Sequence, residues 1–196
     1  IIDKKSAKRF LNINTNKQII CYGSQNPQSK RKGWNIFIKS LEKLDKSKFF
    51  LLIFGNFWSH RALIEIGIEF KSLGYIKNNN VLSNIYSSSD LFVASSIQDA
   101  WPKTFAEAML CKIPVVCFEN TSISEIIEHK VDGYIAKKNN PNDLKKGIEW
   151  ISKKVKNKKY LGQNAWSKIQ GFDAKLISQK YIHLYKRIIQ NKKMVK

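Results

Sequence analysis

The sequence predicts an α/β fold in which helices cover both faces of a parallel sheet. Short apolar runs have the length and composition of buried strands, and stretches with apolar residues at helical spacing lie between them. Strands that alternate with helices in this way form parallel sheets. At 196 residues and 22.7 kDa, the chain is long enough to bury one sizeable core, so we expect one domain.

The first expected strand, Gln18–Tyr22, ends at Gly23 and follows a polar, basic segment, residues 1–17. Because the chain does not begin with Met, we expect a fragment or a processed product, with this segment as a linker from something upstream. The loop Ser24–Lys32 is polar, and Gly33 then opens a helix. The apolar face of this helix carries Trp34, Phe37, Ile38, Leu41 and Leu44.

The second expected strand, Phe49–Phe54, also ends at a glycine, Gly55. Residues 56–67 leave room for only a short helix before a further candidate strand, Ile68–Leu73. A helix over about Asn79–Ser87 then returns the chain to the sheet.

The segment from Asp90 to Glu119 predicts a strand–loop–helix–strand unit. Its parts are the strand Leu91–Ala94, a polar loop with Asp99 and Pro102, the helix Thr104–Cys111 with Glu107, and the strand Ile113–Phe118. Open α/β sheets bind ligands at such loops, because unpaired amides and the helix dipole favour an anion there. Packing alone does not explain two carboxylates with seven residues between them, so we predict the functional site here.

The remaining chain predicts helices. Ser122–His129 has a capping-box spacing between Ser122 and Glu125. Further helices are expected from Pro141, over Tyr160–Ile169 and over Ala174–Ile189. In the last helix Ile177, Tyr181, Leu184 and Ile188 form one apolar stripe. We favour an ordinary packed terminal helix, and a membrane-surface helix is the alternative.

The composition is strongly basic, with 35 Lys and Arg against 15 Asp and Glu and a formal charge of +20. Such a charge suggests nucleic acid or an anionic membrane as a partner. Only four of the basic residues are Arg, and Asn and Ile are abundant, so we favour the codon bias of an AT-rich genome as the explanation. A weak attraction to anionic lipid is expected in either case.

The three cysteines, Cys21, Cys111 and Cys117, lie in apolar elements and lack ligand spacing. Together with the absence of a signal peptide, this indicates reduced core thiols in a cytoplasmic protein. The three histidines are dispersed, so we expect no metal site.

The run from Asp99 to Glu107 (DAWPKTFAE), followed by Ala108–Val116 (AMLCKIPVV), resembles the signature of the family 4 (group 1) retaining glycosyltransferases. In that family two acidic residues flank seven others, and Ala and then Pro-Val-Val follow. The family normally has Glu at the first acidic position. Asp99 keeps the charge but is shorter by one methylene.

The resemblance spans roughly residues 18–190 and implies the C-terminal half of a GT-B fold. That half is a Rossmann-like domain that binds a nucleotide sugar, expected here over residues 18–172, with a C-terminal helix and tail over 173–196. The N-terminal partner domain, which supplies most acceptor contacts, would be missing. The fragment would then bind the donor without turning it over.

The resemblance also implies residue roles. Lys32-Gly33 matches a Lys-Gly pair that grips the donor diphosphate, with a solvated charge run as the alternative reading. Gly23 matches the Gly of a Gly-Arg pair, but Ser24 replaces the Arg, and Arg31 can substitute only if the loop folds back. Glu107 would accept hydrogen bonds from the ribose, and Asp99 would lie nearer the donor sugar.

Backbone amides around Lys103 and Thr104 would also face the diphosphate. Tyr75 and Ile76 are candidate neighbours of the base, and their alternative role is in the core. The other candidate donor-binding residues are Gly55, Ser96, Ala100, Trp101 and Pro102. The expected catalytic set is Asp99, Glu107 and Lys32.

The resemblance matches Val131–Ala136 to a short edge strand. The family often has two glycines where this chain has Asn120-Thr121-Ser122, so we assign Glu125 to a helix cap rather than to a ligand contact.

The implied function is retaining transfer of a hexose-type sugar from a UDP- or GDP-linked donor, without a metal. The acceptor would be a polysaccharide or lipid-linked glycan of the bacterial cell surface, such as lipopolysaccharide, and the enzyme would be cytoplasmic or peripheral at the inner face of the membrane. One alternative is another GT-B enzyme, such as a sugar-nucleotide epimerase. A second is a basic nucleic-acid-binding module, disfavoured because no recognised nucleic-acid motif occurs.

Overall fold

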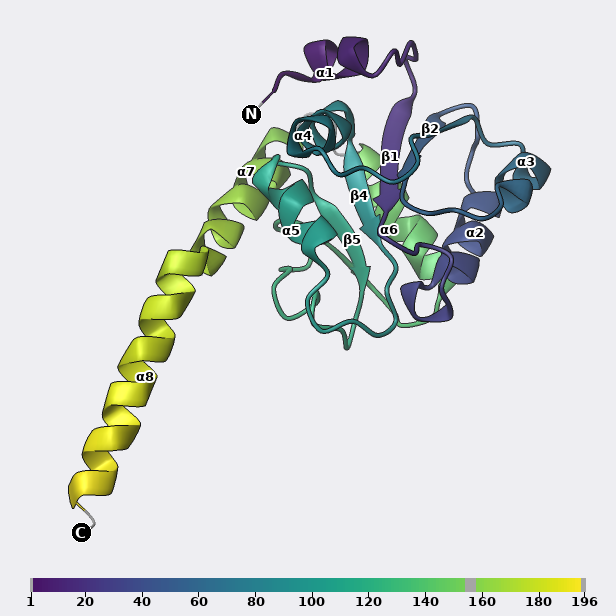
Figure 1. Cartoon of the computed structure of the whole chain (residues 1–196). Helices are drawn as coiled ribbons and strands as arrows, with labels where there is room; N and C mark the ends of the chain where they lie inside the picture. The colour runs from purple at the N-terminus through teal and green to yellow at the C-terminus, as the bar shows by residue number, and fades with distance from the viewer. Residues whose placement is uncertain (1, 154–157, 195–196) are drawn as a thin grey trace.

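The computed structural model describes residues 2–153 and 158–194, which contain a six-stranded sheet. Figure 1 shows the chain and labels some of the strands. The strand order is β3-β2-β1-β4-β5-β6, and every neighbouring pair is parallel. The strands are β1 Gln18–Gly23, β2 Phe49–Phe54, β3 Phe70–Ser72, β4 Leu91–Ala94, β5 Val115–Phe118 and β6 Gly133–Ala136. The predicted parallel sheet is therefore confirmed.

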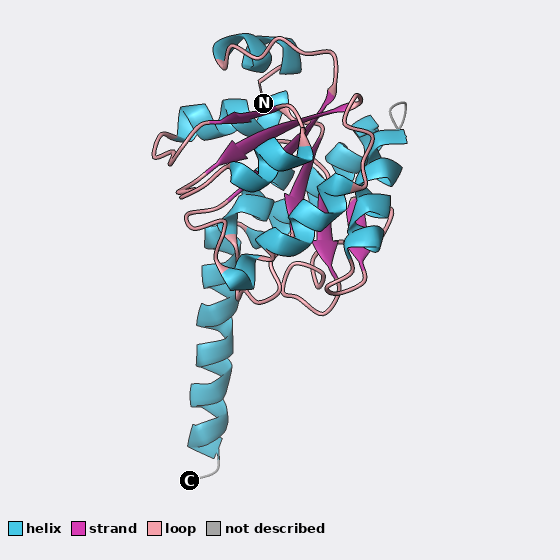
Figure 2. Ribbon diagram, turned by 90° about the vertical axis from the view of Figure 1, so that its right-hand side faces the viewer, coloured by secondary structure: helices cyan, strands magenta, loops and turns pink. Residues whose placement is uncertain are grey.

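Helices cover both faces of this sheet (Figure 2). The α-helices are α1 Lys4–Phe10, α2 Trp34–Glu42, α3 Arg61–Ile66, α4 Asn79–Ser88, α5 Lys103–Leu110, α6 Pro141–Lys153, α7 Lys158–Ile169 and α8 Ala174–Met194. The part of the chain that the structure describes also contains the short 3-10 helices η1 Lys30–Lys32 and η3 Gln170–Phe172. One core cluster joins the sheet to α4, α5 and α7, and the other joins it to α2, α3 and α6.

Strand β2 shows why such apolar runs become central strands. All six of its residues are buried. Phe50, Leu52 and Phe54 belong to one core cluster, while Phe49, Leu51 and Ile53 belong to the other. Successive side chains point to opposite faces of a sheet, so a strand covered on both faces must be apolar at every position.

The strand order reverses direction between β1 and β4, which are neighbours although β2 and β3 lie between them in sequence. At such a switch point the loops after the two strands run to opposite sides of the sheet, which opens a crevice at the carboxyl ends. The loops after β1 and β4 are those that carry Lys32 and Asp99.

The segment 1–17, expected as a linker, contains helix α1. Asp3 caps it by accepting hydrogen bonds from the Lys5 and Ser6 amides. Ala7, Leu11 and Ile13 are buried, and α1 lies against α4. A single buried alanine within α1 gives too little apolar periodicity for sequence reasoning to find this helix.

The helix expected over Ser122–His129 does not form, and that prediction is wrong: residues 122–126 form turns, and His129 makes an isolated parallel bridge with Gly133. Local side-chain bonds compete with a helix here. The Thr121 amide donates to the Ser124 hydroxyl, and the Asp132 carboxylate accepts from the Glu128 amide. Because no helix begins at Ser122, there is no capping box for Glu125 to close, and Glu125 is exposed.

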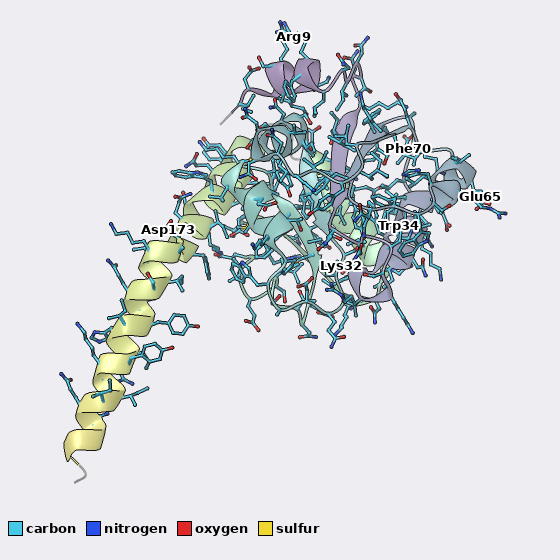
Figure 3. All side chains as sticks on the ribbon, in the orientation of Figure 1. Arg9, Lys32, Trp34, Glu65, Phe70 and Asp173 are labelled. Atoms are coloured by element: carbon cyan, nitrogen blue, oxygen red, sulfur yellow. The ribbon has the colours of Figure 1, made fainter. Side chains whose placement is uncertain are left out.

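Helix α8 also departs from expectation, because it is not packed against the described part of the chain. It extends away from the body in both views (Figures 1 and 2). Figure 3 labels Asp173 where α8 begins, and this residue caps the new helix by accepting from the Lys175 amide. The exposed apolar residues of α8 are Leu176, Tyr181, Ile182, Leu184, Tyr185, Ile188 and Ile189.

None of the described helices combines the length and the hydropathy needed to cross a membrane. The cysteines are free, with Cys21 and Cys117 buried and Cys111 partly so. Burial raises the pKa of the Cys21 and Cys117 thiols. This agrees with the expectation of core thiols.

Candidate functional site

The candidate site is a small crevice at the switch point of the sheet. Residues from β1, β4, their following loops and the start of α5 line it: Tyr22, Gly23, Ser24, Lys32, Phe92, Val93, Ala94, Ser95, Ser96, Pro102 and Thr104. The crevice therefore brings together Gly23, Ser24, Lys32, Ser96, Pro102 and Thr104, six of the residues predicted from sequence. Two larger surface hollows, of about 600 and 630 Å³, lie near Lys48 and along α1, away from these residues.

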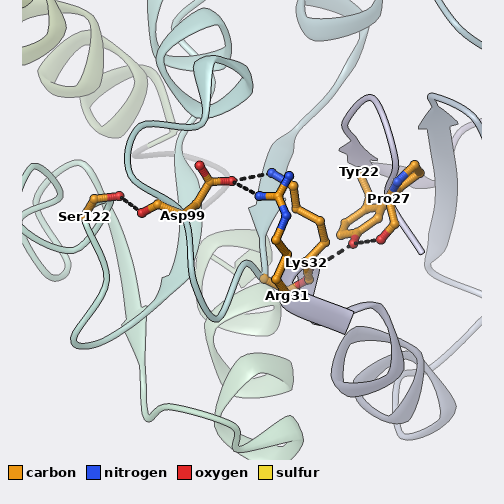
Figure 4. Close-up of polar contacts among 7 residues, drawn as sticks. Tyr22, Pro27, Arg31, Lys32, Asp99 and Ser122 are labelled. Atoms are coloured by element: carbon orange, nitrogen blue, oxygen red, sulfur yellow. Dashed lines mark hydrogen bonds and ion pairs between the residues drawn. The ribbon is translucent and has the colours of Figure 1, made fainter. Parts of the chain in front are cut away.

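The loop after β1 folds back so that η1 lies against the loop after β4. The Arg31 carbonyl accepts a hydrogen bond of 2.8 Å from the Ile97 amide, and the Lys32 carbonyl accepts one of 2.9 Å from the Ser95 hydroxyl. The Tyr22 hydroxyl reaches the Pro27 carbonyl at 3.1 Å and the Lys32 carbonyl at 3.3 Å (Figure 4). These bonds fix the direction in which the Lys32 side chain leaves the turn.

Gly33 permits this close approach. Its φ is +68°, and a Cβ there would lie 2.0 Å from the Ser95 carbonyl oxygen. An L side chain is disfavoured by both the backbone conformation and the space. Gly33 is therefore needed for the close approach of its turn to Ser95 in the loop after β4.

Asp99 accepts hydrogen bonds from two cations. Its Oδ2 bonds Lys32 Nζ, and Arg31 Nη1 lies 3.3 Å away (Figure 4). The Asp99 and Lys32 side chains are only 14% and 11% exposed, whereas Arg31 is 55% exposed. The Ser122 hydroxyl donates to the Asp99 carbonyl at 2.8 Å and so ties down the loop that carries the carboxylate.

Glu107 lies on α5 and has a different partner. Its Oε2 accepts a 2.8 Å hydrogen bond from the Tyr86 hydroxyl of α4. Burial, and then the negative charge of Glu107, raise the pKa of Tyr86 well above its usual value. Tyr86 is therefore a neutral donor that orients Glu107.

The start of α5 can accept an anion. Pro102 is its N-cap residue, and among the described residues no side chain caps the helix. Amides near Lys103 and Thr104 at this end carry the positive end of the helix dipole toward the crevice. Ser96, which is buried, also lines the crevice.

Ser24 stands in the crevice with an unused hydroxyl. Its Oγ is buried and has no hydrogen-bond partner among the described residues. An unpaired buried hydroxyl is costly, and a ligand oxygen in the crevice would satisfy it. The serine that replaces arginine in the motif is thus still able to contact an anion.

Other predicted residues lie at the same edge but outside the crevice. The Gly55 amide donates to the Gly74 carbonyl at 2.7 Å, which joins the ends of β2 and β3. Beyond it, Tyr75 is 48% exposed, and Ile76 packs against the core. Ala100 is exposed.

Trp101 is 41% exposed and packs beside two aromatic rings. Its ring centroid lies 5.2 Å from that of Phe105 and 5.3 Å from that of Phe172, just before α8. The tryptophan thus joins the Asp99 loop to the base of α8, rather than lining the crevice.

Sequence reasoning missed the positioning residues Tyr86 and Ser95 and gave Ser122 another role. Tyr86 lies 21 positions before Glu107, and nothing in its local pattern separates it from a core tyrosine. The sequence predicts a helix cap at Ser122, because a serine three positions before an acidic residue is typical of the start of a helix. Only the folded chain shows that its hydroxyl serves Asp99.

Among residues 2–153 and 158–194, no group of three or more His, Cys, Asp or Glu side chains is placed to hold a metal ion. The prediction of metal-free chemistry stays a prediction, because the arrangement of protein ligands alone does not test it.

Comparison with known proteins places these features in context. The model of the family "Glycosyl transferases group 1" matches residues 3–168. A curated N-acetylgalactosaminyltransferase of Campylobacter jejuni, which acts on N,N'-diacetylbacillosaminyl-diphospho-undecaprenol, is 27% identical over 163 residues. That alignment covers 82% of this chain and 43% of the relative.

Solved structures share the fold at low identity. A glycosyltransferase of Rickettsia africae superposes with a TM-score of 0.81 at 20% identity, covering 95% of this chain and 52% of the other. The Anabaena protein HepE, solved with UDP-glucose, gives 0.80 at 22% identity, covering 94% and 52%. The chain spans about half the length of these proteins.

Proposed function

The chain belongs to the group 1 glycosyl transferases, and from this premise we propose that it is the donor-binding half of a retaining hexosyltransferase. The donor is a nucleoside diphosphate sugar, and we expect this half on its own to bind the donor without transferring the sugar. The observation that carries the proposal is the convergence of Lys32, Arg31 and the start of α5 at the switch-point crevice.

The proposed chemistry follows from the charges at this crevice. Transfer breaks the bond between the anomeric carbon and a diphosphate oxygen, which keeps the electron pair. The acceptor hydroxyl forms the new bond to that carbon on the same face of the sugar and gives its proton to the departing diphosphate. Lys32, Arg31 and the amides of α5 stabilise the growing negative charge.

The two carboxylates take separate roles in the proposal. Glu107, oriented by Tyr86, accepts hydrogen bonds from the ribose hydroxyls. Asp99 accepts hydrogen bonds from the sugar and stabilises positive charge at the anomeric carbon. The Ser24 hydroxyl donates to the diphosphate in place of the arginine that the family has there.

We propose UDP as the first nucleotide to test, because the Anabaena neighbour of similar fold is solved with UDP-glucose. The base would rest near Tyr75 and Ile76, at the carboxyl end of β3. A GDP-linked donor is the alternative.

The proposed acceptor is a lipid-linked or polysaccharide glycan of the bacterial cell surface. Two observations support it. The Campylobacter relative acts on a sugar carried by diphospho-undecaprenol. Helix α8 has an exposed apolar face and no acidic residue in a chain of net charge +20, which suits an anionic membrane surface. The enzyme would then work in the cytoplasm, peripherally bound to the inner face of the membrane.

Calorimetric titration of this chain with UDP, GDP, UDP-glucose and GDP-mannose tests donor binding. We expect micromolar-to-millimolar affinity for one nucleotide and its sugar conjugate, weakened about tenfold or more by Glu107→Ala, because a lost charge-assisted hydrogen bond costs about 1.5–3 kcal/mol. A matched control is Glu119→Ala, whose carboxylate bonds the Lys138 amide outside the crevice. Absence of binding to all four ligands would contradict the proposal.

Sedimentation with vesicles tests membrane association separately. We expect binding to phosphatidylglycerol vesicles, weaker binding to phosphatidylcholine vesicles, and loss of binding in Ile188→Asp. Ile64→Asp is the control, because Ile64 is 68% exposed but lies on α3. Equal binding by both variants and by the unchanged chain would argue against a role for α8.

A further inference from the structure

In the free site, the two cations proposed to hold the diphosphate are already paired with one carboxylate. Asp99 Oδ2 accepts from Lys32 Nζ and lies 3.3 Å from Arg31 Nη1. The contact is largely shielded from water, since the Lys32 and Asp99 side chains are 11% and 14% exposed. Glu107 differs, because its described side-chain partner is the neutral hydroxyl of Tyr86.

Any diphosphate that takes Lys32 must therefore displace Asp99 or share the cation with it. The released carboxylate stays beside the diphosphate, because Ser122 holds its loop through the Asp99 carbonyl. Like charges at this separation repel strongly where water is scarce. A ligand without a group that can donate a hydrogen bond to the released Asp99 carboxylate is therefore bound more weakly.

The two ligands of the reaction differ in what they offer. A nucleotide sugar has hydroxyls that can donate to the released carboxylate, and its diphosphate, esterified at both ends, carries about two negative charges. A free nucleoside diphosphate lacks the transferred sugar, and its terminal phosphate, with a second pKa of about 6, raises the charge toward three near pH 7. Asp99 therefore meets more repulsion and receives no hydrogen bond.

We propose that Asp99 is a specificity-determining residue that makes the site prefer the nucleotide sugar over the free nucleoside diphosphate. When the free nucleoside diphosphate is bound, Asp99 competes with the diphosphate for Lys32 and Arg31. With a sugar, it exchanges these cations for sugar hydroxyls. The consequence for the enzyme is easier release of the spent nucleotide. This inference rests on the proposed donor-binding function.

Removing a binding residue usually lowers affinity, but removing the charge of Asp99 should raise the affinity for one of the two ligands. In Asp99→Asn, we expect the affinity for the free nucleoside diphosphate to rise about tenfold, while that for the nucleotide sugar stays level or falls. The ratio of the two affinities therefore shifts at least tenfold toward the free nucleotide. Asp99→Glu keeps the charge and should keep the discrimination.

Calorimetry with UDP against UDP-glucose, and with GDP against GDP-mannose, measures this ratio on the 196-residue chain. Glu107→Gln is the matched control: it should weaken both ligands of a pair equally, because both contain the ribose. Combining Asp99→Asn with Lys32→Met should remove the gain for the free nucleotide, since the released cation is then missing. Asp99→Ser is a second neutral variant should Asp99→Asn fail to fold in urea titration.

The outcomes separate the two claims. If the unchanged chain binds neither ligand of either pair, the proposed function fails, and the inference fails with it. If it binds them but neutral variants leave the affinity ratio unchanged, or weaken the free nucleotide, only the inference is overturned.

Discussion

Similar side chains are buried in the body of the molecule and exposed on helix α8. Tyr86 on α4 is 1% exposed and lies between other aromatic rings, whereas Tyr185 on α8 is 58% exposed. Charges differ in the same sense. Lys32 and Arg31 meet Asp99 at the crevice, but α8 contains no acidic residue at all.

The contrast shows what an amphipathic pattern predicts and what it does not. Helix α6 and helix α8 both carry apolar residues at helical spacing, and the sheet covers the apolar face of α6. The spacing identifies the face that is favourable to bury. It does not identify the surface that buries it, which depends on the rest of the fold.

The largest expected difference is in the cost of removing an aromatic ring. Phe92→Ala, in the central strand β4, should lower the free energy of unfolding by about 3–5 kcal/mol, because it leaves a cavity at a position that is 1% exposed. Tyr185→Ala should change it by less than about 0.5 kcal/mol. Urea titration followed by circular dichroism compares the two.

Two results would contradict this difference between the body and helix α8. A loss in Tyr185→Ala as large as that in Phe92→Ala would mean that α8 is covered in solution. A concentration-dependent loss would identify a second copy of the chain as the cover.

The sequence predicted the body well for a physical reason. Runs such as Phe49–Phe54 are apolar at every position, which only a strand covered on both faces requires. Prediction failed for Ser122–His129, where hydroxyl and carboxylate side chains bond the local backbone. It also failed for the packing of α8, although the helix itself forms as predicted. Both failures lie where contacts rather than periodicity decide the structure.

The next largest effect should come from the glycine that lets the site close. Gly33→Ala should cost more than about 2 kcal/mol, because the left-handed conformation costs about 1–2 kcal/mol and the new Cβ would lie 2.0 Å from the Ser95 carbonyl oxygen. Gly67→Ala has a similar φ, +72°, but open space, so it should cost only about 1–2 kcal/mol. Unfolding measurements give both values.

Nucleotide binding adds a second readout for this glycine pair. Only Gly33→Ala should weaken it, since Gly33 fixes the turn that presents Lys32. Equal costs and equal binding in the two variants would show that the close approach to Ser95 is unimportant.

A smaller effect is expected from the hydroxyl that orients Glu107. Tyr86→Phe should lower stability by about 1.5 kcal/mol, the lower end for a hydrogen bond to a charged group, because Glu107 is only partly buried. Tyr134→Phe removes a comparable bond, from the hydroxyl to Asp143 Oδ1 at 3.2 Å, on the edge strand β6. We expect both variants to lose stability but only Tyr86→Phe to lose nucleotide affinity, as calorimetry can check.

This pair also separates what could be predicted of the site from what could not. The spacing and position of Asp99 and Glu107 predict them, and Lys32 is predicted from the resemblance of Lys32-Gly33 to the family's Lys-Gly pair. Tyr86 could not be, because its role depends on how α4 packs beside α5. A loss of nucleotide affinity in Tyr134→Phe would instead point to a general loosening of the sheet.

The smallest effect concerns His129, whose titration depends on the folded body. Its Nδ1 accepts a 3.0 Å hydrogen bond from the Ile135 amide, so the ring must be neutral at that nitrogen. Desolvation, and then the charge of Lys130, lower the pKa of His129 from its usual 6.5. The unfolded chain therefore binds this proton more readily than the folded chain does.

The sign of the pH dependence follows from linkage. The contribution of His129 to stability is fully present above pH 6.5 and is lost as the pH falls from there through the lowered folded pKa. In His129→Gln, urea midpoints between pH 7.5 and 5 should decline less than in the unchanged chain. Asp3 and Asp45 also have lowered pKa values, but their contributions to stability are lost at more acidic pH. The change between pH 7.5 and 5 therefore reports on histidine. An identical decline in both proteins would mean that the folded body does not change the pKa of His129.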